Sequence, residues 1–246
     1  IISANYTVEE FGYFTFSFTI ANAVMLLLDA FNTILFPKTI DLMSSNDNKK
    51  KADALEKMRV GYISTSHMLV YLAMICFPVL VWLIPKYMPA LSSMNMIALA
   101  VLMNTNSYGY SNMLIAQNKE RKAGFISAVS LIVNIILGLG LAKILNVEYS
   151  YIIIATLVAY MISSFFMAYE GDTILRGKKS VSYTLRHFFP IRMFIPYMIA
   201  LVISCTQIEY LIFIPLLVFI ILNYKDLQIL KDIAWKLVKK PEVIDV

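Results

Sequence analysis

Charged residues are scarce in this chain of 246 residues. Asp, Glu, Lys and Arg make up 15% of it and hydrophobic residues 59%, whereas about a quarter of the residues of an ordinary soluble domain are charged. This composition excludes a soluble enzyme with one water-facing active site. Together with the mean hydropathy of +0.71, it predicts an all-α polytopic membrane protein, because a spanning helix takes roughly 20 apolar residues.

Cysteine and histidine are also rare, with two of each. Cys76 and Cys205 fall inside apolar runs, where a cysteine acts as a small hydrophobic residue rather than as half of a disulfide. The histidines lie far apart, and no metal-ligand spacing, Ser-His-Asp arrangement or carboxylate pair can be identified. We therefore expect no enzymatic activity, no metal and no cofactor.

Seven apolar runs are long enough to cross or nearly cross a bilayer. They cover residues 11–36, 60–84, 91–116, 124–145, 149–169, 191–208 and 210–224. The last two are short and form either a helical hairpin, which the charges favour, or one long kinked helix. We divide the chain into five transmembrane helices within 1–170, a cytoplasmic linker at 171–190, two further transmembrane helices within 191–224 and a cytoplasmic amphipathic tail at 225–246.

Basic residues concentrate in alternate connectors. Of the 21 Lys and Arg residues, 19 lie in the connectors 37–59, 117–122 and 171–192 or in the tail. Because such residues stay on the cytoplasmic side of short loops, we expect the chain to begin outside, cross seven times and end in the cytoplasm. Since the chain begins at Ile1, we expect a fragment without its N-terminal part, which supplies an odd number of spans if the whole protein starts inside.

The location of these charges also bears on partners. The net charge of +5 belongs to membrane connectors, so we expect membrane lipids and no nucleic acid as partners. In the tail, one helix face is apolar and faces away from the lysines, which predicts a helix lying in the headgroup plane. That face carries Leu227, Leu230, Ile233, Ala234 and Leu237.

Polar side chains form a stripe along several of the predicted helices. On the first helix, Thr15, Asn22, Asp29 and Thr33 fall within about 40° of one another at 100° per residue. The other helices carry Ser64, His67 and Tyr71; Asn104, Ser107 and Ser111; Ser127, Ser130, Asn134 and Gly138; and Thr156, Tyr160 and Ser163. If these faces converge, they line a hydrated path, whose candidate residues are Thr15, Asn22, Asp29, Asn104, Ser107 and Asn134.

Two interpretations of these stripes compete. Small and polar residues also line tight helix–helix contacts, where they permit close approach and hydrogen bonding. Asp29 is the only acid deep within a predicted span, and an ionisable group there is a candidate for ion coupling or substrate contact. His67 is better explained as a packed or interfacial residue than as a proton relay.

Several short motifs occur in a familiar order. They are Gly12-Tyr13 opening a span that ends at Phe36-Pro37, the outer Tyr87 to Ala90, the basic loop Gln117 to Lys122, Asn134 within the next span, and Ile154 to Thr156. Over about residues 8 to 170 the chain resembles the C-terminal half of the polysaccharide and O-antigen flippases, in the multidrug/oligosaccharidyl-lipid/polysaccharide exporter superfamily. The turn NVEYSY departs from the family, because it lacks the usual glycines.

The resemblance implies two six-helix lobes that rock about a central cavity in a bacterial cytoplasmic (inner) membrane, with two extra helices at the end of this chain. It implies seven missing upstream spans and, as substrate, an undecaprenyl-diphosphate-linked oligosaccharide for surface polysaccharide biosynthesis. Polysaccharide polymerase and glycosyltransferases are the candidate protein partners. Family members are thought to use cationic cavity residues for the pyrophosphate, whereas the sequence places no Lys or Arg deep in these spans.

Two other functions stay open. A cation-coupled multidrug exporter of the same superfamily has a use for Asp29, although a drug site prefers an apolar, aromatic pocket to amides and hydroxyls. A membrane glycan polymerase or acyltransferase needs reactive groups on a substantial outer or membrane-embedded site. The outer connectors are only a few residues long, which argues against the polymerase.

Overall fold

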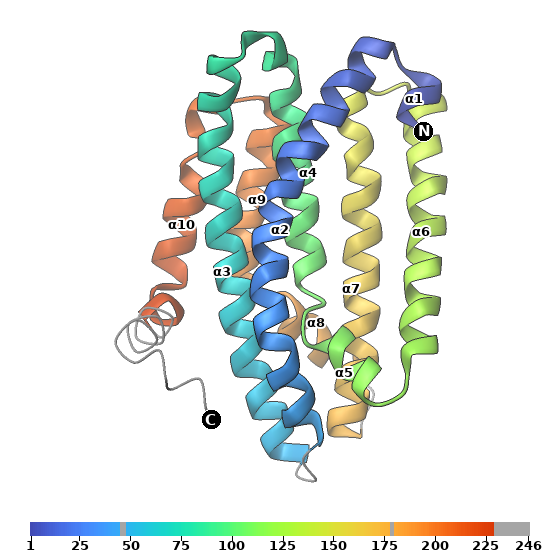
Figure 1. The fold of residues 1–246 in the computed structure, drawn as a ribbon, viewed down its shortest axis with the longest axis vertical. Helices are drawn as coiled ribbons and strands as arrows, with labels where there is room; N and C mark the ends of the chain where they lie inside the picture. The colour runs from blue at the N-terminus through green and yellow to red at the C-terminus, as the bar shows by residue number, and fades with distance from the viewer. Residues whose placement is uncertain (45–47, 178–179, 229–246) are drawn as a thin grey trace.

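The structure, a computed structural model, describes residues 1–44, 48–177 and 180–228. All regular elements in these ranges are helical, with η denoting 3-10 helices (Figure 1). In chain order they are α1 (Ile2–Asn5), α2 (Val8–Ser44), α3 (Asn48–Leu83), η1 (Pro85–Ala90), α4 (Leu91–Thr105), α5 (Tyr110–Ala116), α6 (Glu120–Lys143), η2 (Tyr149–Ile152), α7 (Ile153–Arg176), α8 (Val181–Phe188), α9 (Ile191–Thr206), η3 (Glu209–Leu211) and α10 (Ile214–Leu222).

Five helical segments are long and apolar enough to cross a membrane. They are Val8–Ala30, Met58–Leu83, Pro85–Thr105, Glu120–Lys143 and Tyr149–Ile174. A sixth results if α8 and α9, which are bent by 63°, form one broken span. The nine residues of α10 are too few to cross a bilayer as an α-helix. The prediction of an all-α polytopic membrane protein is confirmed, with five or six of the seven expected spans meeting the length requirement.

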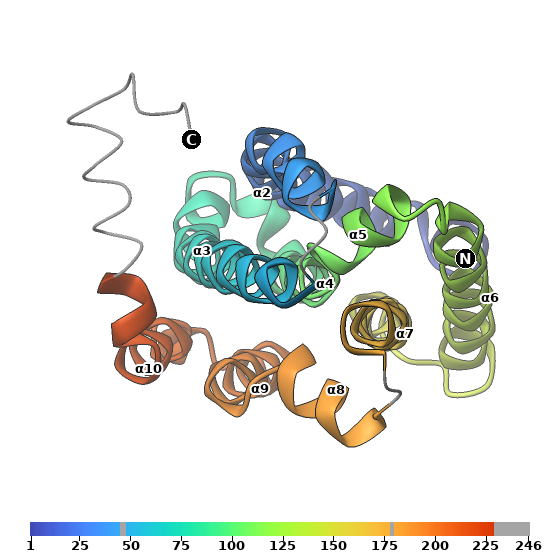
Figure 2. The same cartoon turned by 90° about the horizontal axis from the view of Figure 1, so that it is seen from below.

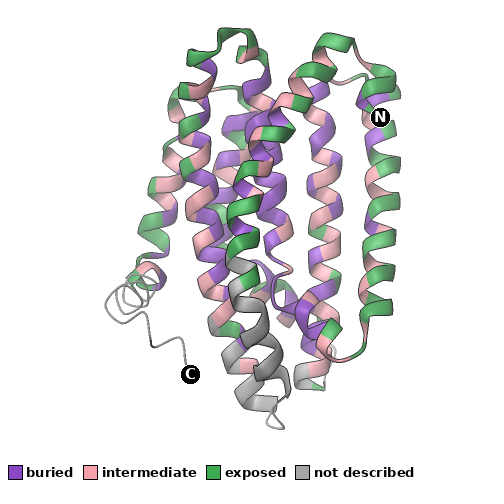
Figure 3. Ribbon diagram, viewed as in Figure 1, coloured by how far each residue is buried: buried purple, intermediate pink, exposed green. Residues whose placement is uncertain are grey.

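The helix α4 forms the centre of the bundle. It packs against α2, α3, α7 and α9, and Met94, Leu99 and Leu102 are fully buried on it. Figure 3 shows the opposite pattern on α6, whose outer face is exposed. That face carries Phe125, which is 71% exposed. Large apolar side chains facing outward are what a helix needs on its lipid side.

Consecutive long helices alternate in direction, so their connections gather at two ends of the bundle (Figure 1). One end, here the basic end, holds the end of α2, the start of α3, the α5–α6 connection, the end of α7 and the end of α10. The other, here the short-loop end, holds α1, η1, η2 and η3. The basic connectors therefore meet at one end of the molecule, and the assignment of that end to the cytoplasm stays a prediction.

The connectors at the basic end are more helical than the sequence predicts. The expected loop 37–59 is largely helix, because α2 continues to Ser44 and α3 begins at Asn48. Its segment KKKADALEKM is rich in residues of high helix propensity. The expected linker 171–190 likewise contains the last turns of α7 and all of α8. Of the predicted amphipathic tail, residues 229–246 lie outside the described residues.

The third apolar run, expected as one helix over 91–116, is broken. α4 ends at Thr105, and α5 begins at Tyr110 after a turn in which Gly109 has φ +79°. Thr105 and Asn106 donate side-chain hydrogen bonds to the carbonyl of Leu102, and Ser107 donates to that of Asn104. Such local bonds compete with the helical ladder. The turn is enclosed by protein, since Asn106, Tyr108 and Gly109 are buried, so its backbone does not face lipid.

Gly109 permits this turn for two reasons, and its replacement tests both. Its positive φ is costly for any residue with a Cβ, and a Cβ there lies 2.6 Å from Cδ1 of Leu55 and 3.0 Å from Cγ of Arg59. We expect Gly109→Ala to lower the free energy of unfolding by about 1–3 kcal/mol, measured by thermal unfolding in detergent.

The matched control is Gly124→Ala in α6, where nothing lies within 4 Å of the added Cβ. This substitution is expected to stabilise the protein by roughly 0.5–1 kcal/mol, because alanine favours the helix. Equal melting temperatures for the two variants would contradict the strained role of Gly109.

Candidate functional site

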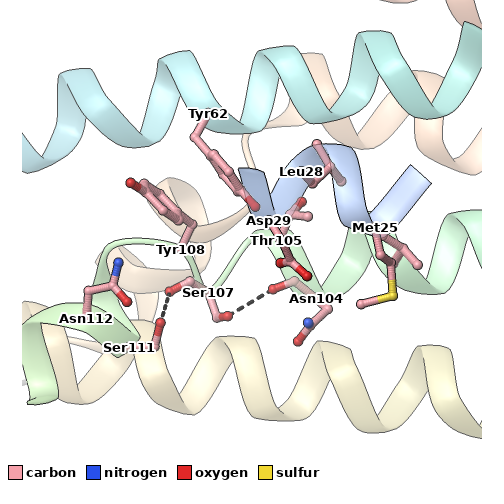
Figure 4. A pocket seen from close by; sticks show the side chains of 11 residues that line it. Met25, Leu28, Asp29, Tyr62, Asn104, Thr105, Ser107, Tyr108, Ser111 and Asn112 are labelled. Atoms are coloured by element: carbon pink, nitrogen blue, oxygen red, sulfur yellow. Dashed lines mark hydrogen bonds between the residues drawn. The ribbon is translucent and has the colours of Figure 1, made fainter. Parts of the chain in front are cut away.

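A cleft of about 150 Å³ lies beside the break between α4 and α5. Figure 4 shows its walls, which come from α2, α3, α4, α5 and the turn between the last two. We call it the polar cleft. Its lining residues are Met25, Leu28, Asp29, Tyr62, Val101, Asn104, Thr105, Ser107, Tyr108, Ser111 and Asn112.

The hydroxyl groups of the cleft bond to the backbone of their own segment. Ser107 donates to the Asn104 carbonyl at 2.9 Å, and Ser111 donates to the Ser107 carbonyl at 3.5 Å (Figure 4). Thr105 donates to the Leu102 carbonyl at 2.7 Å. Since each hydroxyl proton is used within the segment, the oxygen lone pairs remain available as acceptors.

Two amides supply unused donors beside these acceptors. Asn112 is 7% exposed, and its Nδ2 has no hydrogen-bond partner among the described residues. The half-buried Asn104 reaches the cleft from the last turn of α4. An amide offers both donors and acceptors without the cost of a buried charge. The cleft therefore suits a neutral ligand that is rich in hydroxyl groups.

Two tyrosines form an aromatic wall on one side of the cleft. The rings of Tyr62 and Tyr108 are stacked, with centroids 3.9 Å apart and planes 20° apart. Tyr62 comes from α3 and Tyr108 from the turn, so the stack joins the broken run to its neighbouring helix. Tyr62 and Tyr108 are only 7% and 5% exposed, so the stack closes this side of the cleft and gives it a rigid wall.

Asp29 contributes the only carboxylate of the cleft lining. It belongs to α2 and is exposed, and its neighbours Leu26 and Leu27 are 69% and 56% exposed. No hydrogen bond to its side chain occurs within the described part of the chain, where Thr33 bonds only to its backbone carbonyl. The carboxylate is thus open to a ligand or an ion entering the cleft.

The structure brings together three of the six predicted pathway residues. Asp29, Asn104 and Ser107 line the polar cleft. Thr15 is exposed and donates to the Phe11 carbonyl, nearer the short-loop end. Asn22 is half-buried on α2 and outside the cleft lining, and Asn134 accepts a hydrogen bond from Thr156 at 3.3 Å. Asn134 thus joins α6 to α7.

Other polar stripes also serve helix contacts. Ser130 on α6 donates to the Ala159 carbonyl on α7 at 2.8 Å. His67 is fully buried, with its Nδ1 3.0 Å from the Tyr71 hydroxyl and its ring stacked on Phe219 of α10. These contacts match the packing interpretation of the stripes. The polar faces do not all converge on one path.

A buried charged cluster that our sequence analysis does not predict lies behind the cleft. Arg59, expected in a connector, is 3% exposed and donates from Nη2 to the Asn106 carbonyl at 3.3 Å. Its guanidinium lies over the ring of Tyr110 at 3.9 Å. The Tyr110 hydroxyl donates to Asp172 at 3.1 Å, and Thr184 donates to the same carboxylate at 2.9 Å.

This cluster leaves part of Arg59 unpaired. Nε and Nη1 have no hydrogen-bond partner among the described residues. A buried guanidinium usually has an acceptor for each of its N–H donors, so the two unpaired nitrogen atoms of Arg59 are unusual. The cluster could have been predicted by extending the two apolar helices into their connectors. Because α3 begins at Asn48 and α7 ends at Arg176, Arg59 and Asp172 belong to these helices and lie on their buried faces.

No family model, curated protein or solved structure matches this chain. Within the described residues, no group of three or more His, Cys, Asp or Glu side chains could hold a metal ion.

A hydrated cleft can be tested by cysteine labelling. Single cysteines at Asn104 and Ser107, in a background with Cys76 and Cys205 replaced by alanine, are expected to react with a membrane-impermeant maleimide in open vesicles. The cysteine thiolate is the nucleophile that attacks the maleimide, and a thiol ionises in water rather than in lipid. A cysteine at Ile136, which is 63% exposed on α6, serves as the lipid-facing control. Labelling at 104 and 107 no faster than at 136 contradicts a water-filled cleft.

Proposed function

We propose that this chain forms part of a flippase that moves a lipid-linked oligosaccharide across a membrane, with the polar cleft as a section of the path for the sugar. The observation that carries the proposal is the break between α4 and α5, which places amides, hydroxyls and two tyrosines on one cleft. Broken helices at membrane depth are typical of transporter binding sites, because they free polar groups to face a cavity.

The chemistry of the cleft suits a sugar better than an apolar ligand. Each sugar hydroxyl both donates and accepts, and Asn104, Asn112 and Ser111 offer matching groups. The stacked Tyr62 and Tyr108 are buried, so they fix the shape of the cleft wall beside these polar groups rather than offer an open ring face. Neutral polar groups bind without the desolvation cost of a charge, which favours passage over tight retention.

Arg59 supports the same proposal for the lipid-linked end of the substrate. Its Nη2 bonds the carbonyl directly before Ser107, so a positive charge lies behind the cleft wall. A diphosphate link carries negative charge that this buried guanidinium attracts through the wall, without direct contact. Under this proposal the membrane is the bacterial cytoplasmic membrane, and glycosyltransferases and a polysaccharide polymerase are the partner enzymes.

Deletion of the gene for this chain in its native host tests the proposal. We expect lipid-linked intermediates to accumulate while surface polysaccharide disappears, with both restored by a plasmid copy. Complementation with Asn104→Leu is expected to restore at least tenfold less polymer, because the cleft loses its amide. The control is Thr15→Val on α2, outside the cleft. Unchanged glycans in the deletion strain contradict the proposal.

A second candidate, a cation-coupled multidrug exporter, is favoured by the exposed carboxylate of Asp29 in the cleft lining. If Asp29 couples transport to protons or sodium, Asp29→Asn removes the dependence of transport on both, because the amide cannot exchange a charge. Transport is measured over a pH and sodium series. Unchanged dependence in this variant removes Asp29 as the coupling group, and new sensitivity of the deletion strain to cationic drugs with normal glycans favours the exporter.

A further inference from the structure

A second cavity, of about 230 Å³, lies at the short-loop end. We call it the end cavity. It lies between η1, α4, the segment before η2, the end of α9 and η3. Its lining residues are Met88, Pro89, Leu91, Ser92, Asn95, Glu148, Ile203, Ser204, Gln207, Glu209 and Ile212.

All formal charge in the lining is negative. Glu148 and Glu209 are exposed at the rim, and no Lys, Arg or His belongs to the described lining. The helix α9 ends here, where Gln207 adopts a left-handed conformation with φ +55°. A helix C-terminus carries partial negative charge, which favours a cation. Burial also raises the pKa of the Glu209 carboxyl, as expected where desolvation is not offset by a neighbouring positive charge.

The side chain of Asn95 independently indicates that the end cavity binds a hydrogen-bond donor. It is 4% exposed, it lines the end cavity, and its Oδ1 has no hydrogen-bond partner among the described residues. A buried carbonyl oxygen without a donor costs free energy that a ligand N–H recovers. The cavity therefore combines an unpaired acceptor in its buried wall with two carboxylates at its rim.

The remaining lining is mixed, with Ser92, Ser204 and Gln207 beside an apolar part. Met88, Leu91, Ile203 and Ile212 line the end cavity beside Asn95. Apolar walls suit a ligand with a hydrocarbon part, and the two carboxylates fall short of the three or more ligating side chains that would mark a metal centre in the described chain.

We infer that the end cavity binds a primary organic ammonium group. The –NH3 head, with three donors, lies between Asn95 and the carboxylates of Glu148 and Glu209, and its carbon chain lies against the apolar wall. The ligand chemistry is shared by two sources, an aminolipid headgroup and a soluble amine. This inference is independent of the proposed sugar path, since the end cavity and the polar cleft share no lining residue.

Binding of hexylammonium to the purified full chain in neutral detergent, measured by isothermal titration calorimetry, tests the inference. We expect saturable binding of hexylammonium and none of hexanol or magnesium at the same concentrations. Glu209→Gln and Asn95→Leu are each expected to weaken binding about tenfold or more, because each removes an acceptor from the ammonium. Glu120→Gln, an exposed glutamate at the start of α6, is the matched control with unchanged affinity.

Equal binding of hexanol, or unchanged affinity in both Glu209→Gln and Glu148→Gln, overturns the inference. The glutamate variants preserve side-chain size, so they remain informative if Asn95→Leu fails to fold.

Repeating the hexylammonium titration in nanodiscs separates the two sources of the ammonium group. Weaker apparent affinity in phosphatidylethanolamine than in phosphatidylcholine indicates that the lipid headgroup occupies the end cavity, and equal affinity indicates a soluble amine. Because the readout is binding, failure here leaves the transport result unaffected.

Discussion

The need to satisfy backbone hydrogen bonds without water governs this structure. In a bilayer each unpaired backbone N–H or C=O costs several kcal/mol. The chain therefore crosses as helices, in which these groups bond to one another. One exception lies between Thr105 and Tyr110, where short side chains take over part of the backbone bonding. That exception is enclosed by α2, α3 and α7, as Figure 2 shows from the basic end. The polar cleft exists because the helix is interrupted inside protein rather than in lipid.

The sequence predicts the elements that depend on composition. Apolar length identifies the spanning helices, and the distribution of Lys and Arg groups the same connectors that the structure places at one end. The sequence-based prediction of helix boundaries fails where helix propensity and burial favour different structures. Residues 37–44 and 48–59 are polar enough for a loop, yet they extend α2 and α3 because most of their side chains favour the helix. The run 91–116 is apolar enough for one helix, yet Gly109 and its polar neighbours break it.

The site is less predictable than the fold. The position of a residue along a helix tells on which face its side chain lies, but it does not tell which neighbouring helix or cavity that face contacts. Asn104 and Ser107 meet Asp29, whereas Asn134, with the same residue type, meets Thr156 in the neighbouring helix. A polar side chain in a span must find a partner, and both a cavity and an adjacent helix satisfy that need. Arg59 differs from its prediction in the opposite way. From the sequence it counts among the basic residues of a connector, yet α3 includes it and it is 97% buried behind the cleft.

The chain of contacts from Arg59 through Tyr110 and Asp172 to Thr184 joins α3, α5, α7 and α8. Its consequence is mechanical. The helix α8 is short and amphipathic and lies at the basic end, outside the long helices. Thr184 of α8 and Tyr110 of α5 donate to the same Asp172 carboxylate, and Tyr110 stands in the first turn of α5, next to Ser111 and Asn112. The small surface helix is thus anchored to the floor of the polar cleft through one buried carboxylate.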